Sequence, residues 1–462
     1  MRVSMKRGAA LLLVVLALTP VGSRAVDGGA GASDSTRLSL LSAVERSLGQ
    51  YPTVGAARAS QDEARAVAGS ALSAWYPSLR VSGSATEYQK PYLVLPLHSF
   101  NLNPRNLPAF SRSIAQGALT ANYLLFNGGI RESRIREARA RAAGADAALG
   151  AAEQALVANV TAAYLDVIGA AQILQAHDRR LIALRSERTR IAQQLEVGRA
   201  ARVDLLRIDA TIASAEADRV RGAAALDTGE RNLALLVGAP PDSVRSARLK
   251  TVALADTVLV ARDALVARAF RASPAIEQGR RQLAAARAGL GAARGARWPN
   301  LSLAGNYLGF ADLNDMSGDK ETEWSAAAQI SMPIFTGGQI SRDIERARAA
   351  ERGAAEQLRL AETQAQQQID RSISSVEEAH ARVMSLTSAA VTFREVARIQ
   401  DLSYQAGVGT QTDYLTAVAD LFSAEANLVG ARFQEIKSRI ELARITGVLT
   451  ADWLAGNLED AR

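Results

Sequence analysis

The stretch LLFNGGIRESRIREARA at residues 124–140 has a near copy in the same chain, IFTGGQISRDIERARA at residues 334–349. In both, an aromatic residue, a small polar residue and two glycines precede a run rich in arginine, glutamate and alanine. Glycine adopts backbone conformations that are closed to other residues, and the run that follows is built of strong helix formers. The sequence therefore predicts two equivalent bends, each at the start of a helix.

The similarity extends beyond these stretches and indicates an internal duplication. From the glycine pair onward the two copies keep a constant offset of 209 residues, and upstream of it the offset is 222. The matched residues are Phe126 with Phe335, Gly128 with Gly337, Gly129 with Gly338, Gly198 with Gly407, Asp204 with Asp413, and Pro77 with Pro299. Each copy spans about 200 residues, far more than a solenoid repeat. The duplicated unit is therefore the size of a domain.

Each copy is expected to contain long helices and one pair of strands. Residues 130–195 and 339–404 lack proline and are dominated by helix formers, so each could form a helix roughly 100 Å long. Residues 78–88, 114–126, 301–307 and 324–334 alternate apolar with small or polar side chains, which is the period of a strand. Each is about the 9 to 11 residues with which a tilted strand crosses a bilayer. A long coiled coil would explain the helices but not these strands.

Four strands are too few to close a membrane barrel, since the smallest have about eight. An open sheet edge in lipid would leave backbone groups unpaired at a cost of several kcal/mol each. If the strands lie in a membrane, several chains must share one barrel: two would give eight strands and three would give twelve, with room for a lumen. The small and polar side chains on one face suit water, which favours three.

The N-terminus has the pattern of a secretory signal peptide at residues 1–25. Basic residues precede an apolar run from Ala9 to Leu18, and Ser23-Arg24-Ala25 supplies a cleavage site. No other window approaches 18 consecutive apolar residues, so no transmembrane helix is expected. The chain contains no cysteine, which excludes disulfides and a lipid anchor on an N-terminal cysteine.

Charge and histidine content argue against two further classes. The formal charge of +7 falls to 50 basic against 47 acidic residues without residues 1–25, which is too balanced for nucleic-acid binding. The three histidines, His98, His177 and His380, are not spaced as metal ligands. We therefore expect no metal, no cofactor and no catalytic site.

Further paired motifs complete a recognisable pattern. Trp75-Tyr76-Pro77 and Trp298-Pro299 start the strand regions, and the turns LEVGRAARVDLL (195–206) and YQAGVGTQTDYL (404–415) end the long helices. In this order, and twice over, they resemble the TolC-like outer membrane factors across nearly the whole mature chain. The resemblance implies a mostly α-helical homotrimer in which a 12-stranded membrane β-barrel continues into a 12-helix periplasmic α-barrel.

The resemblance also divides the chain. Residues 26–238 form the first repeat, with a hairpin at 78–126 and a long helix at 130–197. Residues 239–261 form a linker that belongs to a belt around the helices. Residues 262–447 form the second repeat, with a hairpin at 300–335 and a long helix at 339–405, and residues 448–462 form a tail. Helices are expected around residues 38–74 and 262–297, and the second hairpin is expected to end at Phe335.

Candidate site residues follow from the same resemblance. Val197, Gly198, Gly407 and Val408 match the periplasmic tip turns where adaptor hairpins dock. Asp413 matches an aspartate of the constriction, and Asp204 and Tyr404 match residues that latch neighbouring helices. The strand-to-helix bends are Phe126, Gly128, Gly129, Phe335, Gly337 and Gly338, and the strand starts are Pro77 and Pro299. Plainer alternatives remain open, because tight helix turns need glycine and helix N-termini favour carboxylates.

The chain departs from the family pattern at two tip positions. Gly409 stands where some members carry an arginine, and Thr416 replaces a second aspartate. The latch is therefore expected to be weaker, or to use Arg199 or Arg202.

The implied function is that of an outer-membrane exit duct without enzymatic activity. Such a duct passively conducts substrates in a tripartite efflux pump or type I secretion system. Its partners would be a periplasmic adaptor, an inner-membrane transporter of the RND, ABC or MFS type, and outer-membrane lipid in a Gram-negative bacterium. The alternative is a non-conducting structural coiled-coil protein of the periplasm.

Overall fold

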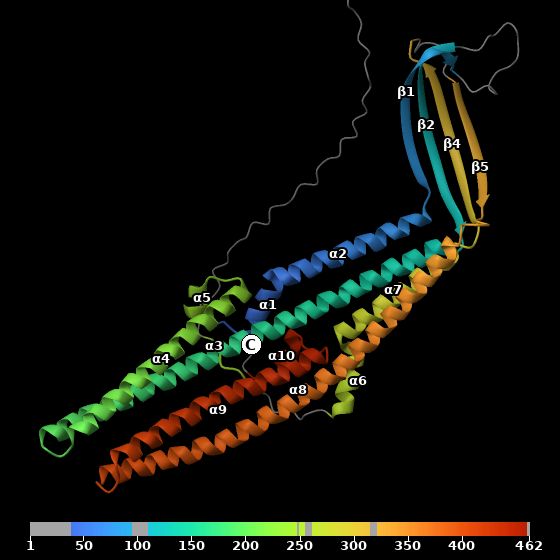
Figure 1. Ribbon diagram of the computed structural model, residues 1–462. Coiled ribbons are helices and arrows are strands. Elements are labelled where there is room, and N and C mark those ends of the chain that lie inside the picture. Colours follow the sequence, from blue (N-terminus) through green and yellow to red (C-terminus); the bar gives the residue numbers. More distant parts are fainter. Residues whose placement is uncertain (1–37, 95–109, 247–248, 255–260, 315–320, 460–462) are drawn as a thin grey trace, which may run out of the picture.

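The structure is a computed structural model of the 462-residue chain and describes residues 38–94, 110–246, 249–254, 261–314 and 321–459. The expected signal peptide and His98 lie outside the described residues. A narrow sheet stands at one end of an elongated molecule, and long helices run away from it (Figure 1).

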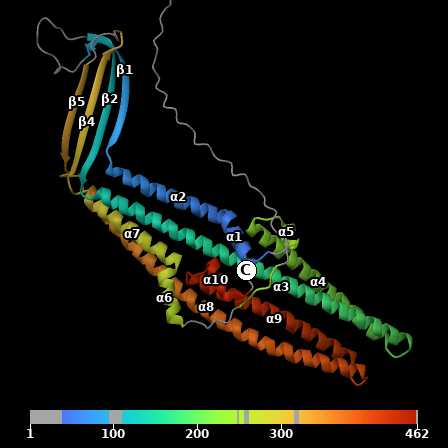
Figure 2. The ribbon, with the colours of Figure 1, turned by 180° about the vertical axis from the view of Figure 1, so that it is seen from behind.

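Four helices make up the part of the molecule farthest from the sheet. The two longest, α3 (Ile130–Glu196) and α8 (Gln339–Gln405), each contain 67 residues, which is roughly 100 Å of helix. α4 (Arg202–Val237) and α9 (Gln411–Ile445) return beside them. The neighbours in this half run in the order α4, α3, α9, α8 (Figures 1 and 2).

Nearer the sheet the order is α2, α3, α7, α8, so that short helices complete the layer. Helices lie in both ranges where they were expected, 38–74 and 262–297, and each range is divided at a proline. The first divides into α1 (Leu40–Gln50), α2 (Pro52–Leu72) and a 3₁₀ turn at Ser73–Trp75. The second divides into α6 (Arg262–Ala272) and α7 (Pro274–Gly295). The cause is proline at the first position of α2 and α7, because the residue before a proline is driven into extended conformation.

The sheet contains β1 (Ser78–Leu93), β2 (Phe110–Asn127), β4 (Asn300–Asp312) and β5 (Glu321–Ser331), all antiparallel and in the order β1-β2-β4-β5. The two hairpins therefore join through β2 and β4. β1 and β2 contain 16 and 18 residues and exceed the expected 9 to 11. Pairing resumes beyond an irregularity between Glu87 and Tyr92, so residues 89–93, which read as a loop, belong to β1.

The register gives the sheet two different faces. Val81, Leu119, Tyr307 and Trp324 lie in one row across the four strands. The adjacent row, on the opposite face, contains Arg80, Thr120, Asn306 and Ser325. Both faces are largely open to solvent in the single chain. One face is therefore apolar and the other polar, as the alternation predicted.

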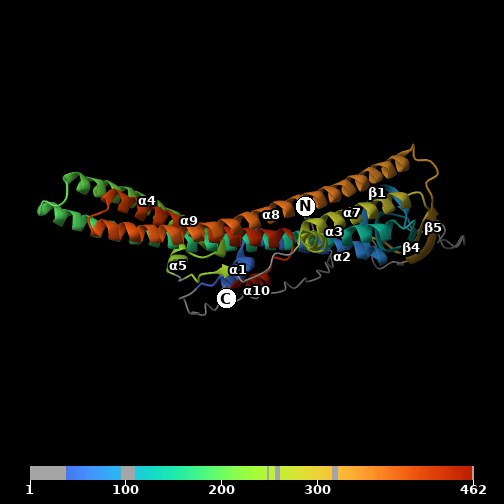
Figure 3. The same ribbon diagram turned by 90° about the horizontal axis from the view of Figure 1, so that it is seen from below.

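A group of short elements, which we name the belt, lies beside the middle of the long helices. It comprises α1, α5 (Pro241–Ser246), α10 (Ala451–Asn457) and the two-stranded sheet of β3 (Ala253–Leu254) and β6 (Leu458–Glu459). These elements lie together along one flank of α3 and α9 (Figure 3). Their apolar side chains share one buried cluster with the middle of α3 and the C-terminal ends of α4 and α9.

Tyr164 of α3 fastens the belt to the long helices. Its hydroxyl oxygen lies 2.8 Å from the Leu38 carbonyl oxygen and 3.1 Å from that of Lys250, and it accepts the Lys250 backbone N–H at 3.0 Å. Burial raises the pKa of Tyr164 to about 12. An 18-residue window of α3 is apolar enough to cross a membrane, with mean hydropathy 1.4, but 56% of it is buried inside the molecule. That burial is typical of a core helix.

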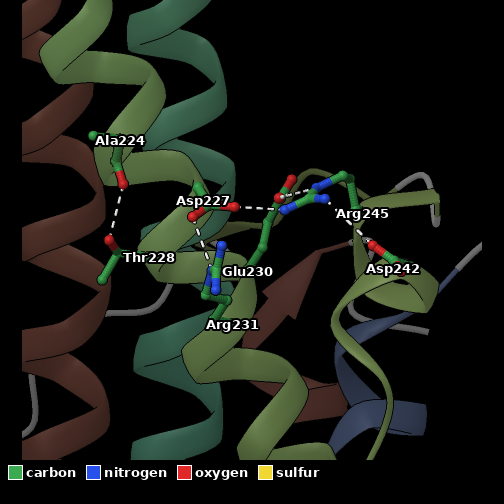
Figure 4. Close-up of polar contacts among 7 residues, drawn as sticks. All are labelled: Ala224, Asp227, Thr228, Glu230, Arg231, Asp242 and Arg245. Carbon is green, nitrogen blue, oxygen red and sulfur yellow. Dashed lines mark hydrogen bonds and ion pairs between the residues drawn. The ribbon is translucent and has the colours of Figure 1, made fainter.

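A polar cluster ties α5 to α4 (Figure 4). The Arg245 guanidinium contacts the carboxylates of Asp227, Glu230 and Asp242, and Arg231 donates to Asp227 at 2.9 Å. Hydrogen bonding from Arg231 holds the pKa of the Asp227 carboxyl below its ordinary value. The cluster fixes where the belt leaves the end of α4.

Candidate functional site

Two tight turns form the end of the molecule farthest from the sheet. α3 ends at Glu196 and α4 begins at Arg202, while α8 ends at Gln405 and α9 begins at Gln411. Gly198 and Gly407 have φ angles of +73° and +75°, a region that favours glycine. No atom lies within 4 Å of a Cβ built at either glycine. Glycine is therefore required by the backbone conformation, and the space beside it is open.

The side chains beside these glycines face solvent. Val197 is 68% exposed and Val408 is 82% exposed. Exposed apolar side chains beside open glycines give each turn a small apolar surface that no described residue covers.

Asp204 and Asp413 both occupy the first turn of a helix. The Asp204 carboxylate accepts the Ala201 backbone N–H at 3.2 Å. The Asp413 carboxylate accepts the Thr410 hydroxyl at 2.7 Å, and that hydroxyl accepts the Asp413 N–H at 3.1 Å. Within one chain the Asp204 carboxylate completes the start of α4, and the Asp413 carboxylate holds the hydroxyl of Thr410, which caps α9. A place in the first turn of a helix is the plainer alternative for Asp413. The Asp413 side chain is exposed, so its negative charge can still act on a group outside the chain.

Polar contacts join the two tips. Arg207 of α4 donates to the Thr412 hydroxyl at 2.9 Å and lies 3.7 Å from the Asp204 carboxylate. Gln411, only 6% exposed, donates its side-chain amide to the Asp204 carbonyl at 3.4 Å. Arg207 therefore bridges the two hairpins within one chain, and a latch that uses Arg199 or Arg202 stays a prediction.

A second bridge lies beside Tyr404. Arg190 of α3 donates twice to Glu187, at 2.8 Å each, and its guanidinium carbon lies 4.3 Å from the centre of the Tyr404 ring. The Tyr404 ring in turn stacks on that of Tyr414, with ring centroids 5.7 Å apart. Burial, with the Glu187 carboxylate close by, raises the pKa of Tyr404. Tyr404 thus links α8 to α3 and α9 within one chain.

An apolar cluster near the tips joins helices that these two bridges also join. Its buried members come from α3, α4 and α9, and they are Leu181, Leu184, Ile191, Ile208, Ala215 and Leu415. Because Leu415 belongs to α9 and the others to α3 and α4, separating the hairpins would expose apolar surface.

The bends at the sheet end differ between the two copies. Gly128 and Gly337 have similar φ angles, +66° and +61°. A Cβ on Gly128 would lie 2.3 Å from the Gly295 carbonyl oxygen and 2.6 Å from Trp298 Cβ, whereas no atom lies within 4 Å of a Cβ on Gly337. The first bend is therefore tightly packed and the second is open. Gly129 and Gly338, also at positive φ, are the N-cap residues of α3 and α8.

Phe126 and Phe335 do not occupy equivalent places. Phe126 lies in β2, but β5 ends at Ser331, so the expectation that the second hairpin continues to Phe335 was wrong. Pro333 is the cause, because proline has no N–H to donate to the strand ladder. The matching residue in the first copy is Leu124, beside the register shift of β2. Pro77 and Pro299 each immediately precede a strand, β1 and β4 respectively.

Arg131 holds the first bend together. Its guanidinium carbon lies 3.6 Å from the centre of the Trp75 ring, and it donates to the Leu124 carbonyl at 2.8 Å. The equivalent residue of the second copy, Ile340, can make neither contact. The duplication thus preserves the bend but not its packing.

The sequence was compared with those of known proteins. The profile of the family described as "Outer membrane efflux protein" matches residues 43–239 and 265–448. The chain belongs to the outer membrane efflux protein family. This confirms the resemblance to TolC-like outer membrane factors.

Relatives of this outer membrane efflux protein come from several bacteria. The chain is 23% identical over 310 residues to the outer membrane protein TolC of Vibrio cholerae, covering 66% of this chain and 70% of that protein. It is 25% identical over 363 residues to the outer membrane efflux protein BepC of Brucella suis, covering 77% of each. The solved outer membrane protein VceC of Vibrio cholerae matches with a TM-score of 0.75 at 20% identity, over 88% of this chain and 96% of that one. The fold is therefore shared with outer-membrane channels.

The predicted site residues lie in two regions of the structure. Asp204, Tyr404 and Asp413 lie at the tips, and the glycine bends lie beside the sheet, as two separate groups. The sequence reasoning missed Glu187, Arg190, Arg207, Gln411 and Tyr414. All five lie within about three helical turns of Gly198 or Gly407 in the sequence, and this proximity could have singled them out. Within the described residues no cluster of three or more His, Asp or Glu side chains could hold a metal ion. His380 instead contacts Glu435 at 2.9 Å.

Proposed function

We propose that this protein is a passive exit duct of the outer membrane of a Gram-negative bacterium, built from three copies of the chain and extending into the periplasm. The observation that carries the proposal is the sheet, which has one apolar face, one polar face and two unpaired edges. A small soluble sheet covers its apolar face with another layer, and here no described layer covers it.

The edges support closure by copies of the same chain. β1 and β5 are the outer strands of a sheet with an even number of alternating strands. β5 of one copy therefore lies antiparallel to β1 of the next. The helices offer matching edges, because α8 closes one side of the layer and α2 with α4 closes the other. Three copies would give a 12-stranded barrel above a 12-helix barrel, with no open edge in lipid.

Two bands of aromatic side chains match the thickness of a membrane. Trp75, Tyr76 and Trp298 lie where the helices meet the sheet, and the paired Tyr307 and Trp324 lie farther along the strands. Tyr307 follows Asn300, the first residue of β4, by seven residues, about 23 Å of strand. A tilt of about 40° reduces this to roughly 18 Å, and the two residues between Trp298 and Asn300 add to it, so the separation is of the order of the apolar band of about 25 Å in outer-membrane barrels.

The tips are the proposed docking site for a periplasmic adaptor. Open space beside Gly198 and Gly407, with Val197 and Val408 exposed, would accept the helical hairpin of a partner. Three copies of Asp413 would form a negative ring at the constriction. An inner-membrane transporter of the RND, ABC or MFS type would deliver the substrate, in an efflux pump or a type I secretion system. No enzymatic step is required of the chain.

The mass of the assembled protein tests the proposal. Chemical crosslinking of the protein purified in detergent should yield trimers of the 48.9 kDa chain, and the purified protein should conduct ions across a planar bilayer. Species no larger than a dimer would refute the trimer. Release into the soluble periplasm without conductance would favour the structural coiled-coil alternative.

A further inference from the structure

Arginine is concentrated where the helices meet the sheet. The segments 130–145, 287–299 and 339–354 form the sheet-proximal ends of α3, α7 and α8, and we name them the collar. They contain twelve arginines and five acidic residues. The excess of seven equals the formal charge of the whole chain. The collar therefore carries a local excess of positive charge, although basic and acidic residues are nearly equal in number without residues 1–25.

Ion pairing divides the arginines of the collar into two groups. Every acidic residue of the collar is already paired with an arginine, and the pairs are Glu132 with Arg131, Glu137 with Arg141, Asp343 with Arg346, Glu345 with Arg342, and Glu351 with Arg287. The remaining seven arginines form no ion pair within the described part of the chain, and all are exposed: Arg134, Arg136, Arg139, Arg294, Arg297, Arg348 and Arg352. Arginine stays charged at any physiological pH, so this charge is not neutralised within the chain.

Six of these seven arginines lie away from the groove of about 1030 Å³ between α3, α7 and α8, and only Arg134 lines it. Arg139 precedes Tyr164 by 25 residues, which is about seven helical turns, so both project from the same side of α3. Tyr164 faces the belt. A duct must keep its lumen open, so the belt side is the outer wall and Arg139 lies on it.

The free arginines are also continuous with the aromatic band. Arg297 directly precedes Trp298, and Arg294 lies one turn earlier. Arg136 and Arg139 follow the start of α3 by about 9 and 14 Å along the helix. A guanidinium on a long side chain can reach back toward the membrane interface. Its planar set of donors matches a phosphate group.

We infer that the collar binds the phosphate groups of anionic phospholipids in the membrane leaflet that faces the helices. The inference rests on the proposed placement of the sheet in a membrane. It follows from three features together: unneutralised positive charge, its position on the outer wall, and continuity with the apolar sheet face. Bound headgroups would hold the barrel at a defined depth and supply the anions that the collar lacks.

Lipid enrichment around the whole protein tests the inference. The full-length protein is reconstituted in phosphatidylcholine vesicles containing a minority of phosphatidylglycerol, extracted gently, and analysed for bound lipid by mass spectrometry. The wild type should retain phosphatidylglycerol a few-fold above its share in the vesicle, and less at high salt. The variant R136Q/R139Q/R294Q should lose at least half of that enrichment.

A matched variant controls for net charge. Arg371, Arg382 and Arg432 are also exposed and without an ion pair in the described structure, and they lie roughly 50 Å or more from the sheet along α8 and α9. R371Q/R382Q/R432Q removes the same charge and should keep the enrichment of the wild type. Equal enrichment in the wild type and the collar variant overturns the inference. So does binding to purified peptidoglycan that depends on the collar arginines without any lipid enrichment.

Failure of the inference is distinguishable from failure of the proposed function. A protein that inserts, forms trimers and conducts ions but shows no lipid preference overturns only the collar assignment. A protein that does not insert into vesicles overturns the proposed function and the lipid assignment with it.

Discussion

The two copies of the glycine bend provide an internal comparison for one mutation. Replacing Gly128 or Gly337 by alanine places a Cβ on a residue with φ near +65° in each case. The left-handed conformation costs an alanine about 1 to 2 kcal/mol at both sites. At Gly337 no other cost arises within the single chain, because the built Cβ meets none of its atoms within 4 Å.

At Gly128 a steric cost is added. The new methyl group would lie 2.3 Å from the Gly295 carbonyl oxygen and 2.6 Å from Trp298 Cβ, and the first of these is backbone that cannot rotate away. Overpacking of this kind costs typically 1 to 3 kcal/mol more. Gly128→Ala should therefore destabilise the assembly by about 2 to 5 kcal/mol, and Gly337→Ala by about 1 to 2 kcal/mol.

Thermal unfolding of the purified protein in detergent measures the difference. Loss of the assembled form on unheated gels and loss of helical circular dichroism should both occur at a lower temperature for G128A than for G337A. The wild type should be the most stable of the three. Equal shifts for the two variants would show that the contact with α7 does not constrain the first bend, and the reasoning from the structure would be refuted.

Three further predictions concern the belt and the tips. The pKa of Tyr164 rises from 10.0 to about 12 on folding. The stability that this group contributes is therefore complete below pH 10 and is lost as the pH rises toward 12. Tyr164→Phe should remove this alkaline part of the pH dependence of unfolding, and an unchanged profile would exclude Tyr164 as its source. Asp413→Asn keeps an acceptor for the Thr410 hydroxyl but removes the charge, so divalent cations should block the channel current less, while undiminished block would place Asp413 away from the constriction. Gly407→Leu should abolish export by a reconstituted pump, because the leucine side chain fills the proposed docking space beside the turn. Trimers should still form, because the strain of about 1 to 2 kcal/mol is local and the space at Gly407 is open within the chain. Normal export by this variant would exclude docking there.

Much of the fold could be predicted from local pattern. The proline-free runs predicted helices that the structure places at Ile130–Glu196 and Gln339–Gln405. Period-two alternation predicted both faces of the sheet. The second hairpin ends before Phe335 because Pro333 cannot donate to the strand ladder. The first hairpin is longer than expected, because β1 and β2 pair again beyond residue 88, where the first strand was expected to end.

The tips were less predictable than the fold. Resemblance singled out Asp204, Tyr404 and Asp413, yet their contacts within the chain depend on residues from three different helices. Arg190 lies more than 200 residues before Tyr404 in the sequence, and only helix packing brings its guanidinium to the ring. Spacing along one helix carries no information about such a contact.

The sequence by itself determined the duplication, the long helices, the two-faced strands and the glycine bends. These depend on periodicity and on backbone preferences, which act over a few residues. Only the tertiary structure decided that within one chain Gly128 is packed and Gly337 is open, that Arg207 bridges the tips, and that seven collar arginines form no ion pair with the described residues. Those outcomes depend on which side chains meet across helices, because ion pairing and steric contact act over a few ångströms of space and not of sequence.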